Sequence, residues 1–245
     1  MPFTLAHPAA AVPFARLFGK YGVLSALVIG SIAPDLHHLF HVGRSATHSL
    51  QGVVVFSLPV GLLCYAVFHL FLKRPLFHLL PESLASRLVP YALRGLPEVP
   101  RAGVMLSILV GALTHVGWDA LTHGETFGQD RLRFLSGTLF SLDGHPFAFC
   151  DALQAGSSLV GVILLGAWFS AWLGRAPRAE SAPPAADGRI PLLMALVSFP
   201  WTHADAAPGA NLLDMVSGLI AAWMNAMVYA ALAYACLWHA FRRIR

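Results

Sequence analysis

Long apolar runs separated by short polar loops dominate the chain. An α-helix needs about 20 apolar residues to cross the hydrocarbon core of a bilayer. The pattern therefore predicts about five membrane-spanning helices. Their expected ranges are 51–72, 103–122, 156–174, 190 to about 206, and 212–241. The fourth is shorter and contains Pro200 and His203, but we expect it to cross as well.

The first 50 residues carry only short apolar stretches. Residues 9–18 and 23–33 are each about ten residues long, and a Gly-Lys-Tyr-Gly sequence separates them. A helical hairpin would bring His7 and Asp35 to the same end, whereas one continuous span would separate them. We favour the hairpin, because a continuous span would also bury two basic side chains at membrane depth.

These patterns predict an all-α fold, a polytopic membrane helix bundle of about five spans plus an N-terminal helical hairpin or extra span. We expect a single integral membrane domain over residues 1–245. Its expected parts are a hairpin with metal-binding motifs at 1–50, core spans at 51–174, a flexible cytoplasmic linker rich in Ala, Pro and Arg at 175–189, and C-terminal spans at 190–245.

The composition agrees with a membrane protein. Hydrophobic residues make up 57% of the chain and charged residues 11%, whereas soluble domains carry roughly 25% charged residues. The net charge is +4, but the basic residues are scattered between apolar spans and form no stripe, which argues against nucleic-acid binding. The isolated cysteines Cys64, Cys150 and Cys236 predict neither a disulfide nor a thiolate site.

Basic residues set the orientation, because cytoplasmic loops are enriched in Lys and Arg. One set of alternate loops carries only Arg131 and Arg133. The opposite set carries Lys73, Arg74, Arg87, Arg94, Arg101, Arg175, Arg178, Arg189, Arg242, Arg243 and Arg245. We therefore expect a cytoplasmic C-terminus. His48, at the start of the first long span, and His123, at the end of the second, then face the extracytoplasmic side.

One polar face interrupts the second span. His115, Asp119 and His123 follow one another at intervals of four, so their side chains project along one side of a helix. A carboxylate and two imidazoles at membrane depth are costly unless they pair with each other or bind something. The face therefore predicts either a ligand site or a structural hydrogen-bonded network inside the bundle.

Further short motifs precede the first long span: His7-Pro8, Pro34-Asp35 followed by histidines at 37, 38 and 41, and Arg44 shortly before Thr47-His48. Each has a plainer interpretation, as a surface or capping residue, a turn, an interfacial polar edge or a helix cap. Together, histidine and aspartate suit a divalent cation, zinc first, with manganese or iron as alternatives. Arg44 would pair with an aspartate or hold a phosphate oxygen.

The opening Met-Pro-Phe-Thr-Leu-Ala-His-Pro-Ala-Ala, the run from Leu24 to Asp35 and the run from Leu109 to His123 resemble the bacterial membrane family catalogued as domain of unknown function 4184. The order of the motifs also resembles the LexA-regulated, membrane-bound, predicted metal-dependent hydrolases and, remotely, zinc-dependent phospholipase C. This resemblance implies a multi-pass protein of the bacterial inner membrane. It implies as metal ligands His7, Asp35, His48, His115 and Asp119, with His123 as a weaker match.

The leading functional hypothesis is a metal-dependent hydrolase. It would cleave a phosphoester or similar bond in a lipid or lipid-linked substrate at the extracytoplasmic face, using one or two bound ions to activate water. Asp119 would bind or bridge metal, and Arg44 would orient the anionic substrate. The alternative is a non-enzymatic metal-binding membrane protein: a transporter, a sensor or a structural metal site. A haem protein is disfavoured, because the histidines cluster with carboxylates at one end. The sequence leaves the oligomeric state open.

Overall fold

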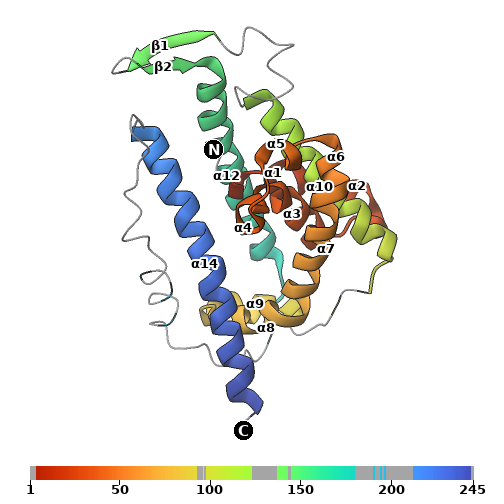
Figure 1. Ribbon diagram of the computed structural model, residues 1–245. Helices are drawn as coiled ribbons and strands as arrows, with labels where there is room; N and C mark the ends of the chain where they lie inside the picture. Colours follow the sequence, from red (N-terminus) through yellow and green to blue (C-terminus); the bar gives the residue numbers. More distant parts are fainter. Residues whose placement is uncertain are drawn as a thin grey trace. The chain divides into compact units, whose positions relative to one another are not determined.

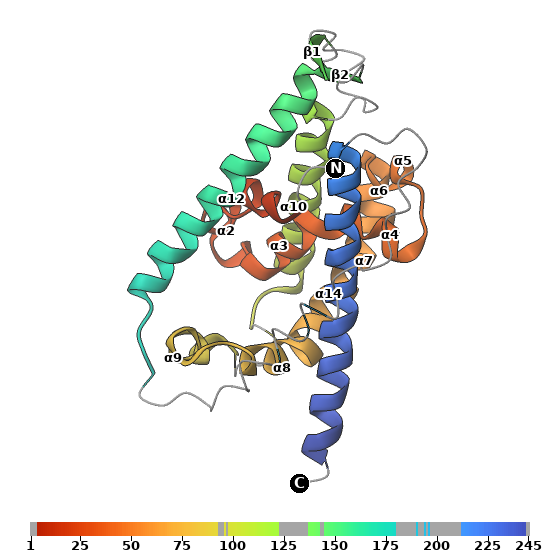
Figure 2. The same cartoon turned by 90° about the vertical axis from the view of Figure 1, so that its left-hand side faces the viewer.

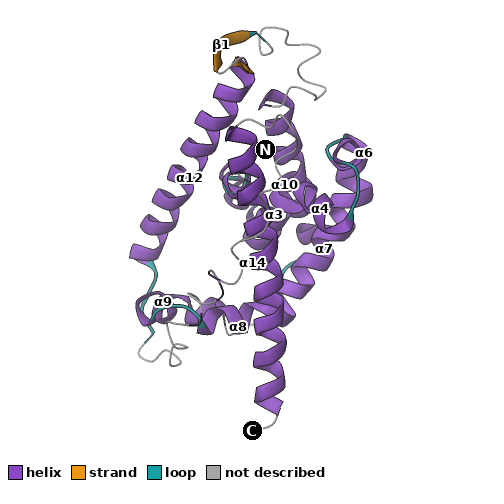
Figure 3. Cartoon of the chain, turned by 60° about the vertical axis from the view of Figure 1, so that its left-hand side comes forward, coloured by secondary structure: helices purple, strands orange, loops and turns teal. Residues whose placement is uncertain are grey.

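A computed structural model of the protein describes residues 4–92, 96, 98–122, 137–142, 145–179, 190, 194, 196 and 212–243. Within these ranges the chain is overwhelmingly helical (Figure 3). The described strands are β1 (Thr138–Leu142) and β2 (His145–Ala148), which pair antiparallel. The prediction of an all-α membrane protein is therefore confirmed, with one short hairpin added.

The chain forms two compact units, Met1–Tyr65 with Glu98–Trp172, and Ala66–Pro97 with Leu173–Arg245. The first contains η1 (Thr4–Ala6), α1 (Pro8–Ala11), α2 (Phe14–Leu17), η2 (Gly19–Tyr21), α3 (Leu24–Ile32), η3 (Ala33–Leu36), α4 (His37–Phe40), α5 (Arg44–Thr47), α6 (Leu50–Gly52), η4 (Val53–Ser57), most of α7 (Leu58–Val67), α10 (Arg101–Thr122), the strands and most of α12 (Phe149–Arg175). The second contains η5 (Phe68–Leu72), α8 (Lys73–His78), α9 (Glu82–Ala92) and α14 (Leu212–Arg243).

Among the described residues, three helical segments are long and apolar enough to cross a membrane, namely Leu50–His78, Arg101–Thr122 and Phe149–Arg175. They match the predicted spans at 51–72, 103–122 and 156–174. The predicted last span is a continuous helix, α14, but it is not among these three. Most of the predicted span at 190–206 and of the linker at 175–189 lies outside the described residues.

The N-terminal segment reverses direction between α2 and α3. A Cβ on Gly22 would lie 2.2 Å from the backbone oxygen of Ala15, so only glycine allows this close approach. The chain leads away from His7 through α1 and α2 and returns through α3 to Asp35. The reversal brings His7 and Asp35 into one buried region, the arrangement that the favoured hairpin requires.

Helix α3 packs closely along α10, and the two lie side by side in both views (Figures 1 and 2). Glycines permit the contact: a Cβ on Gly30 or on Gly111 would lie 2.3 Å from the backbone oxygen of Ile108 or Leu27, respectively. Small residues at helix interfaces in membranes let backbones approach in this way. The packing places the end of α3 beside the polar face of α10.

Ser107 fixes the opposite end of the same helix pair. Its hydroxyl accepts from the backbone N–H of Val23 at 2.9 Å and donates to the carbonyl of Tyr21 at 3.1 Å. The first N–H groups of a helix lack partners within the helix, so this serine of α10 caps α3. The two contacts fix the position of α3 along the axis of α10. They therefore determine which side chains of α10 lie within reach of Asp35.

In the second unit, α9 folds against α8 around the buried side chains of Phe77, Ala85 and Ala92. Arg87 donates to the carbonyls of Leu173 at 2.6 Å and Ala176 at 3.0 Å. The last carbonyls of a helix lack partners within it, so Arg87 caps the end of α12.

Candidate metal centre

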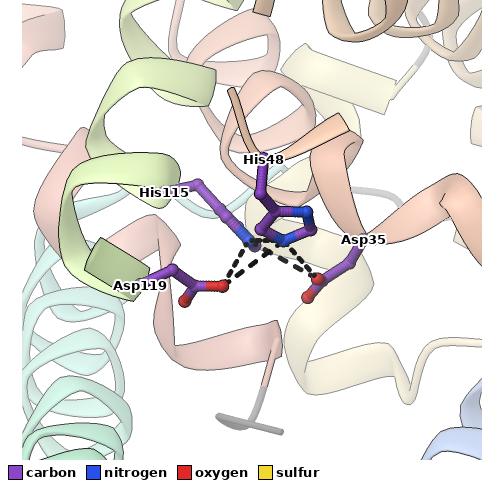
Figure 4. A group of neighbouring side chains, drawn as sticks. All are labelled: Asp35, His48, His115 and Asp119. Atoms are coloured by element: carbon purple, nitrogen blue, oxygen red, sulfur yellow. Dashed lines mark hydrogen bonds and ion pairs between the residues drawn. The ribbon is translucent and has the colours of Figure 1, made fainter. Parts of the chain in front are cut away.

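Four ligand-type side chains converge from three segments of the first unit. Asp35 lies on η3, His48 directly follows α5, and His115 and Asp119 lie one turn apart on α10. Figure 4 shows their nitrogen and oxygen atoms pointing toward a common point. Their side chains are 0–7% exposed. We call these four residues the metal centre.

Local structure explains how His48 reaches this point. Ser49 caps the first long span, because its hydroxyl accepts from the backbone N–H of Gly52 at 2.9 Å. A Cβ on Gly52 would lie 2.2 Å from the carbonyl oxygen of Ala46, so α5 folds tightly onto α6. The tight turn holds His48 at the start of the span. On the other side, Pro34 lies in the first turn of η3, directly before Asp35.

Five of the six pairs of ligand atoms have the spacing of a tetrahedral zinc site. His48 Nε2 lies 3.2 Å from His115 Nε2, 3.3 Å from Asp35 Oδ1 and 3.3 Å from Asp119 Oδ2. His115 Nε2 lies 3.4 Å from Asp35 Oδ1 and 3.6 Å from Asp119 Oδ2. No two ligand atoms are more than 4.8 Å apart. Four ligands bound tetrahedrally at zinc distances are about 3.3–3.6 Å apart.

Hydrogen bonds fix which nitrogen of each imidazole carries the proton. His115 Nδ1 lies 2.7 Å from the carbonyl oxygen of Ser31, which can only accept, so Nδ1 donates. His48 Nδ1 lies 2.9 Å from Thr47 Oγ1, and this hydroxyl already donates to the carbonyl of Arg44. In neutral imidazoles both Nε2 atoms therefore present lone pairs to the centre. Metal-binding histidines commonly have this arrangement.

Charge also favours a cation at this point. Two buried carboxylates with two neutral imidazoles carry a charge of −2, and Arg44 offsets one unit by donating to Asp119 Oδ2. Asp119 is 1% exposed whereas the Arg44 side chain is 33% exposed. Buried charge is costly unless it is paired or binds a metal. Two carboxylate oxygens and two imidazole lone pairs around one point repel each other, and a cation removes that repulsion.

The pKa values of His48 and Asp35, which lie outside the spanning segments, also indicate a site that favours positive charge. Burial acts to lower the pKa of His48, but hydrogen bonds that its protonated ring would donate to Asp119 and Asp35 outweigh burial and raise the pKa above its usual range. Burial acts to raise the pKa of Asp35, but hydrogen bonds from the two imidazoles in their protonated form and from Thr4 outweigh burial, and the pKa lies well below its usual range. The site therefore stabilises positive charge at its centre.

His7 lies beside the metal centre. Its Nε2 is 3.5 Å from Asp119 Oδ1, the carboxylate oxygen that faces away from the other ligands. Its ring stacks on His115 with 3.8 Å between ring centroids and meets the edge of Trp118 at 5.4 Å. His7 is 1% exposed. It is placed to support two of the ligands or to reach an ion through Asp119, and its role as a ligand stays a prediction.

The structure adds contacts around the metal centre that the sequence did not suggest. Thr4 donates to Asp35 Oδ2 at 2.6 Å, and Ser31 contributes its backbone carbonyl to His115. His37 is buried, binds the carbonyl of Pro34 through Nδ1, and its ring meets His48 with 5.5 Å between centroids. A backbone carbonyl leaves no trace in a residue pattern, and Thr4 is 31 residues from its partner.

The remaining histidines of these motifs lie elsewhere. His41 is exposed and ends α4 in the left-handed conformation, with a φ of 52°. His38 is exposed, and its ring lies 3.9 Å from that of His37 at a tilt of 35°. His123, predicted as a weaker ligand, lies outside the described residues. Within those residues, the group with the spacing of a metal site is the metal centre.

Comparisons with known proteins place the chain in a family. No curated protein matches the chain significantly, and neither does any solved structure. A family model does match, over residues 1–236, and it therefore covers all four residues of the metal centre together with His7 and Arg44. The chain belongs to the family described as domain of unknown function DUF4184.

Proposed function

We propose that the protein is a membrane-bound, metal-dependent hydrolase. It would cleave a phosphoester or similar bond in a lipid or lipid-linked substrate, with zinc as the preferred ion. The observation that carries the proposal is the metal centre itself, in which five of the six pairs of ligand atoms from two imidazoles and two carboxylates lie 3.2–3.6 Å apart. A bound zinc ion supplies Lewis acidity toward a phosphoryl oxygen or a water molecule.

The chain's own residues would bind the ion and orient the substrate. Asp35, His48, His115 and Asp119 would hold the ion, and the carbonyl of Ser31 would keep His115 in its metal-binding tautomer. Arg44 is the partly exposed cation at this buried site. A planar guanidinium binds phosphate oxygens through paired hydrogen bonds, so Arg44 would orient an anionic group beside the ion. The order of the motifs, which resembles that of the LexA-regulated predicted hydrolases, supports the same reaction class.

The depth of the site supports a substrate held in the membrane. Asp119 lies three residues before the end of α10, about 4.5 Å from that end at the usual helical rise. Arg101 begins the same helix, and basic residues mark the cytoplasmic ends of spans. The site would thus lie just below the extracytoplasmic rim of a bacterial inner membrane, at the level of lipid phosphates.

A structural metal site is the second candidate, and one observation favours it. Four protein ligands complete a tetrahedral shell, whereas catalytic zinc sites usually keep one position open. Catalysis would need a five-coordinate ion or the release of one carboxylate. A transporter is less well supported, because Ser107, the polar side chain along 103–111, is already bonded to the backbone of α3.

Zinc content and lipid hydrolysis, measured on detergent-purified protein, test the proposal. Wild type and Asp119→Asn would be compared by elemental analysis. They would also be compared for release of phosphate or glycerol phosphate from vesicles containing phosphatidic acid or phosphatidylglycerol. We expect about one zinc per chain and turnover in the wild type, and neither in the variant. Asp151→Asn, a helix-capping aspartate of α12, is the matched control and should keep both.

The outcomes separate the candidates. Zinc without turnover on either lipid favours the structural site. Turnover without zinc or another divalent ion contradicts the proposed mechanism, and so does full activity of Asp119→Asn.

A further inference from the structure

The segment Thr4–His7, which we call the leading segment, lies against the metal centre at two separate points. Thr4 Oγ1 donates to Asp35 Oδ2 at 2.6 Å. The other oxygen, Oδ1, faces both Nε2 atoms. The hydroxyl therefore occupies the oxygen that does not face the ion position and fixes the rotation of the carboxylate. Partners of this kind typically change metal affinity about 10–100-fold when they are lost.

His7 makes the second contact, with two other ligands. Its ring lies flat on His115 at 3.8 Å between centroids, with an angle of 25° between the rings. Its Nε2 faces Asp119 Oδ1 at 3.5 Å. The leading segment therefore contacts three of the four ligands, one through Thr4 and two through His7.

Helix α12 holds the leading segment in place. Ala6, which lies between Thr4 and His7, is 1% exposed. A Cβ on Gly161 would lie 3.2 Å from the Cβ and the carbonyl oxygen of Ala6, and 3.2 Å from the ring of Trp118. Such distances are tighter than most contacts of a Cβ atom, so Gly161 lets α12 lie close against the leading segment. Trp118 also donates to Ser157 of α12 at 3.0 Å.

We propose that the leading segment is a positioning element for the metal centre and that α12 clamps it there through Gly161. Thr4 and Gly161 act through the ligands and do not touch the ion. This inference rests on the metal binding of the proposed function but not on hydrolysis.

Zinc affinity, measured in detergent by competition with a chelating dye, tests the Thr4 contact. Thr4→Val keeps the shape of the side chain and removes the donor, and we expect zinc to bind about 10–100-fold more weakly. Thr4→Ser keeps a hydroxyl, so we expect affinity within about threefold of wild type. A merely structural role for Thr4 would change thermal stability without this difference in zinc affinity.

The clamp is tested with a pair of glycines on the same helix. Gly161→Val adds bulk against Ala6 and should weaken zinc binding about tenfold, which is the lower end of the effect of losing an outer contact. Gly166→Val makes the same chemical change where a Cβ would meet nothing within 4 Å, and should leave zinc affinity unchanged. Circular dichroism would show whether both variants remain helical.

The outcomes test the role of Thr4, the clamp through Gly161 and the metal centre separately. If wild type binds zinc and Thr4→Val binds it equally well, the positioning role is wrong, while the proposed function is untouched. If Gly161→Val and Gly166→Val bind alike, the clamp is wrong and the role of Thr4 is judged on its own variants. If wild type binds no divalent ion at all, the inference and the metal centre are overturned together.

Discussion

Both compact units contain several histidines, but the imidazoles of the two units contact different kinds of groups. In the second unit, His239 Nε2 donates to the carbonyl of Phe71 at 3.0 Å and stacks on its ring. His69 Nδ1 lies 3.4 Å from the ammonium of Lys73, and His78 lies against Trp238. These imidazoles contact a carbonyl, a cation and an aromatic ring, and among the residues that the structure describes they belong to no group with the spacing of a metal site.

In the first unit, by contrast, each imidazole of the metal centre uses Nδ1 on an oxygen and turns Nε2 toward two carboxylates. The local charge also differs, because Lys73 beside His69 repels a cation whereas Asp35 and Asp119 attract one. Several histidines in one unit therefore do not by themselves indicate a metal site. The direction of the lone pairs and the presence of carboxylates do.

The largest effect that this comparison predicts comes from removing an imidazole in each unit. His115→Gln should weaken zinc binding by more than about 100-fold, because the loss of a ligand exceeds the loss of an outer contact. His69→Gln, at another buried position in the second unit, should leave zinc affinity unchanged. Zinc titration of the two purified variants checks this. A similar loss of zinc affinity in the two variants would contradict the assignment of zinc binding to the first unit alone.

Removing the metal should destabilise the two units unequally. A ligand present at 100 times its Kd stabilises the folded state by about 2.7 kcal/mol, and the ligands belong to the first unit. After chelation, hydrogen exchange should quicken in peptides covering η3 and the end of α10. Peptides covering α8 and α9 should change little. Equal loss of protection in both sets would contradict a metal centre confined to the first unit.

A smaller effect is expected from the arginine next to the centre. Arg44→Met removes a positive charge beside Asp119, so zinc should bind roughly 3- to 10-fold more tightly, given the Coulomb energy of a partly exposed pair. Binding of inorganic phosphate to the zinc-loaded protein should be lost at the same time. Arg101→Met, at the other end of α10, is the control and should change neither. Weaker zinc binding by Arg44→Met would instead make Arg44 a support of the ligand set.

The smallest effect lies in the second unit. His239→Gln should cost about 1 kcal/mol of stability, as is usual for one hydrogen bond, with zinc content unchanged. Thermal unfolding with parallel elemental analysis measures both quantities. Loss of zinc from this variant would show that the two units are coupled.

Much of the fold followed from hydropathy alone. The spans at 51–72, 103–122 and 156–174 correspond to the three spanning segments found, because the length needed to cross a bilayer is a local property of the sequence. Part of the site followed as well. His115 and Asp119 share a face because residues four apart on a helix must do so, whatever packs around them.

Other features of the site could not be predicted in this way. The contact between Thr4 and Asp35, the carbonyl of Ser31 on His115, and the burial of His37 depend on how α3 lies along α10. That register is set by backbone contacts at Gly30 and Gly111. A glycine in an apolar run does not reveal which carbonyl it will touch.

The sequence by itself determined that the chain is a helical membrane protein and that imidazoles and carboxylates interrupt its apolar segments. Only the tertiary structure decided that Asp35 and His48 meet the face of α10 and that their lone pairs converge. It also decided that His69, His78 and His239, the described histidines of the second unit, belong to no group with the spacing of a metal site. Periodicity fixes directions within one helix, whereas a coordination shell needs atoms from distant segments placed within a few tenths of an ångström. Close packing between helices supplies that accuracy.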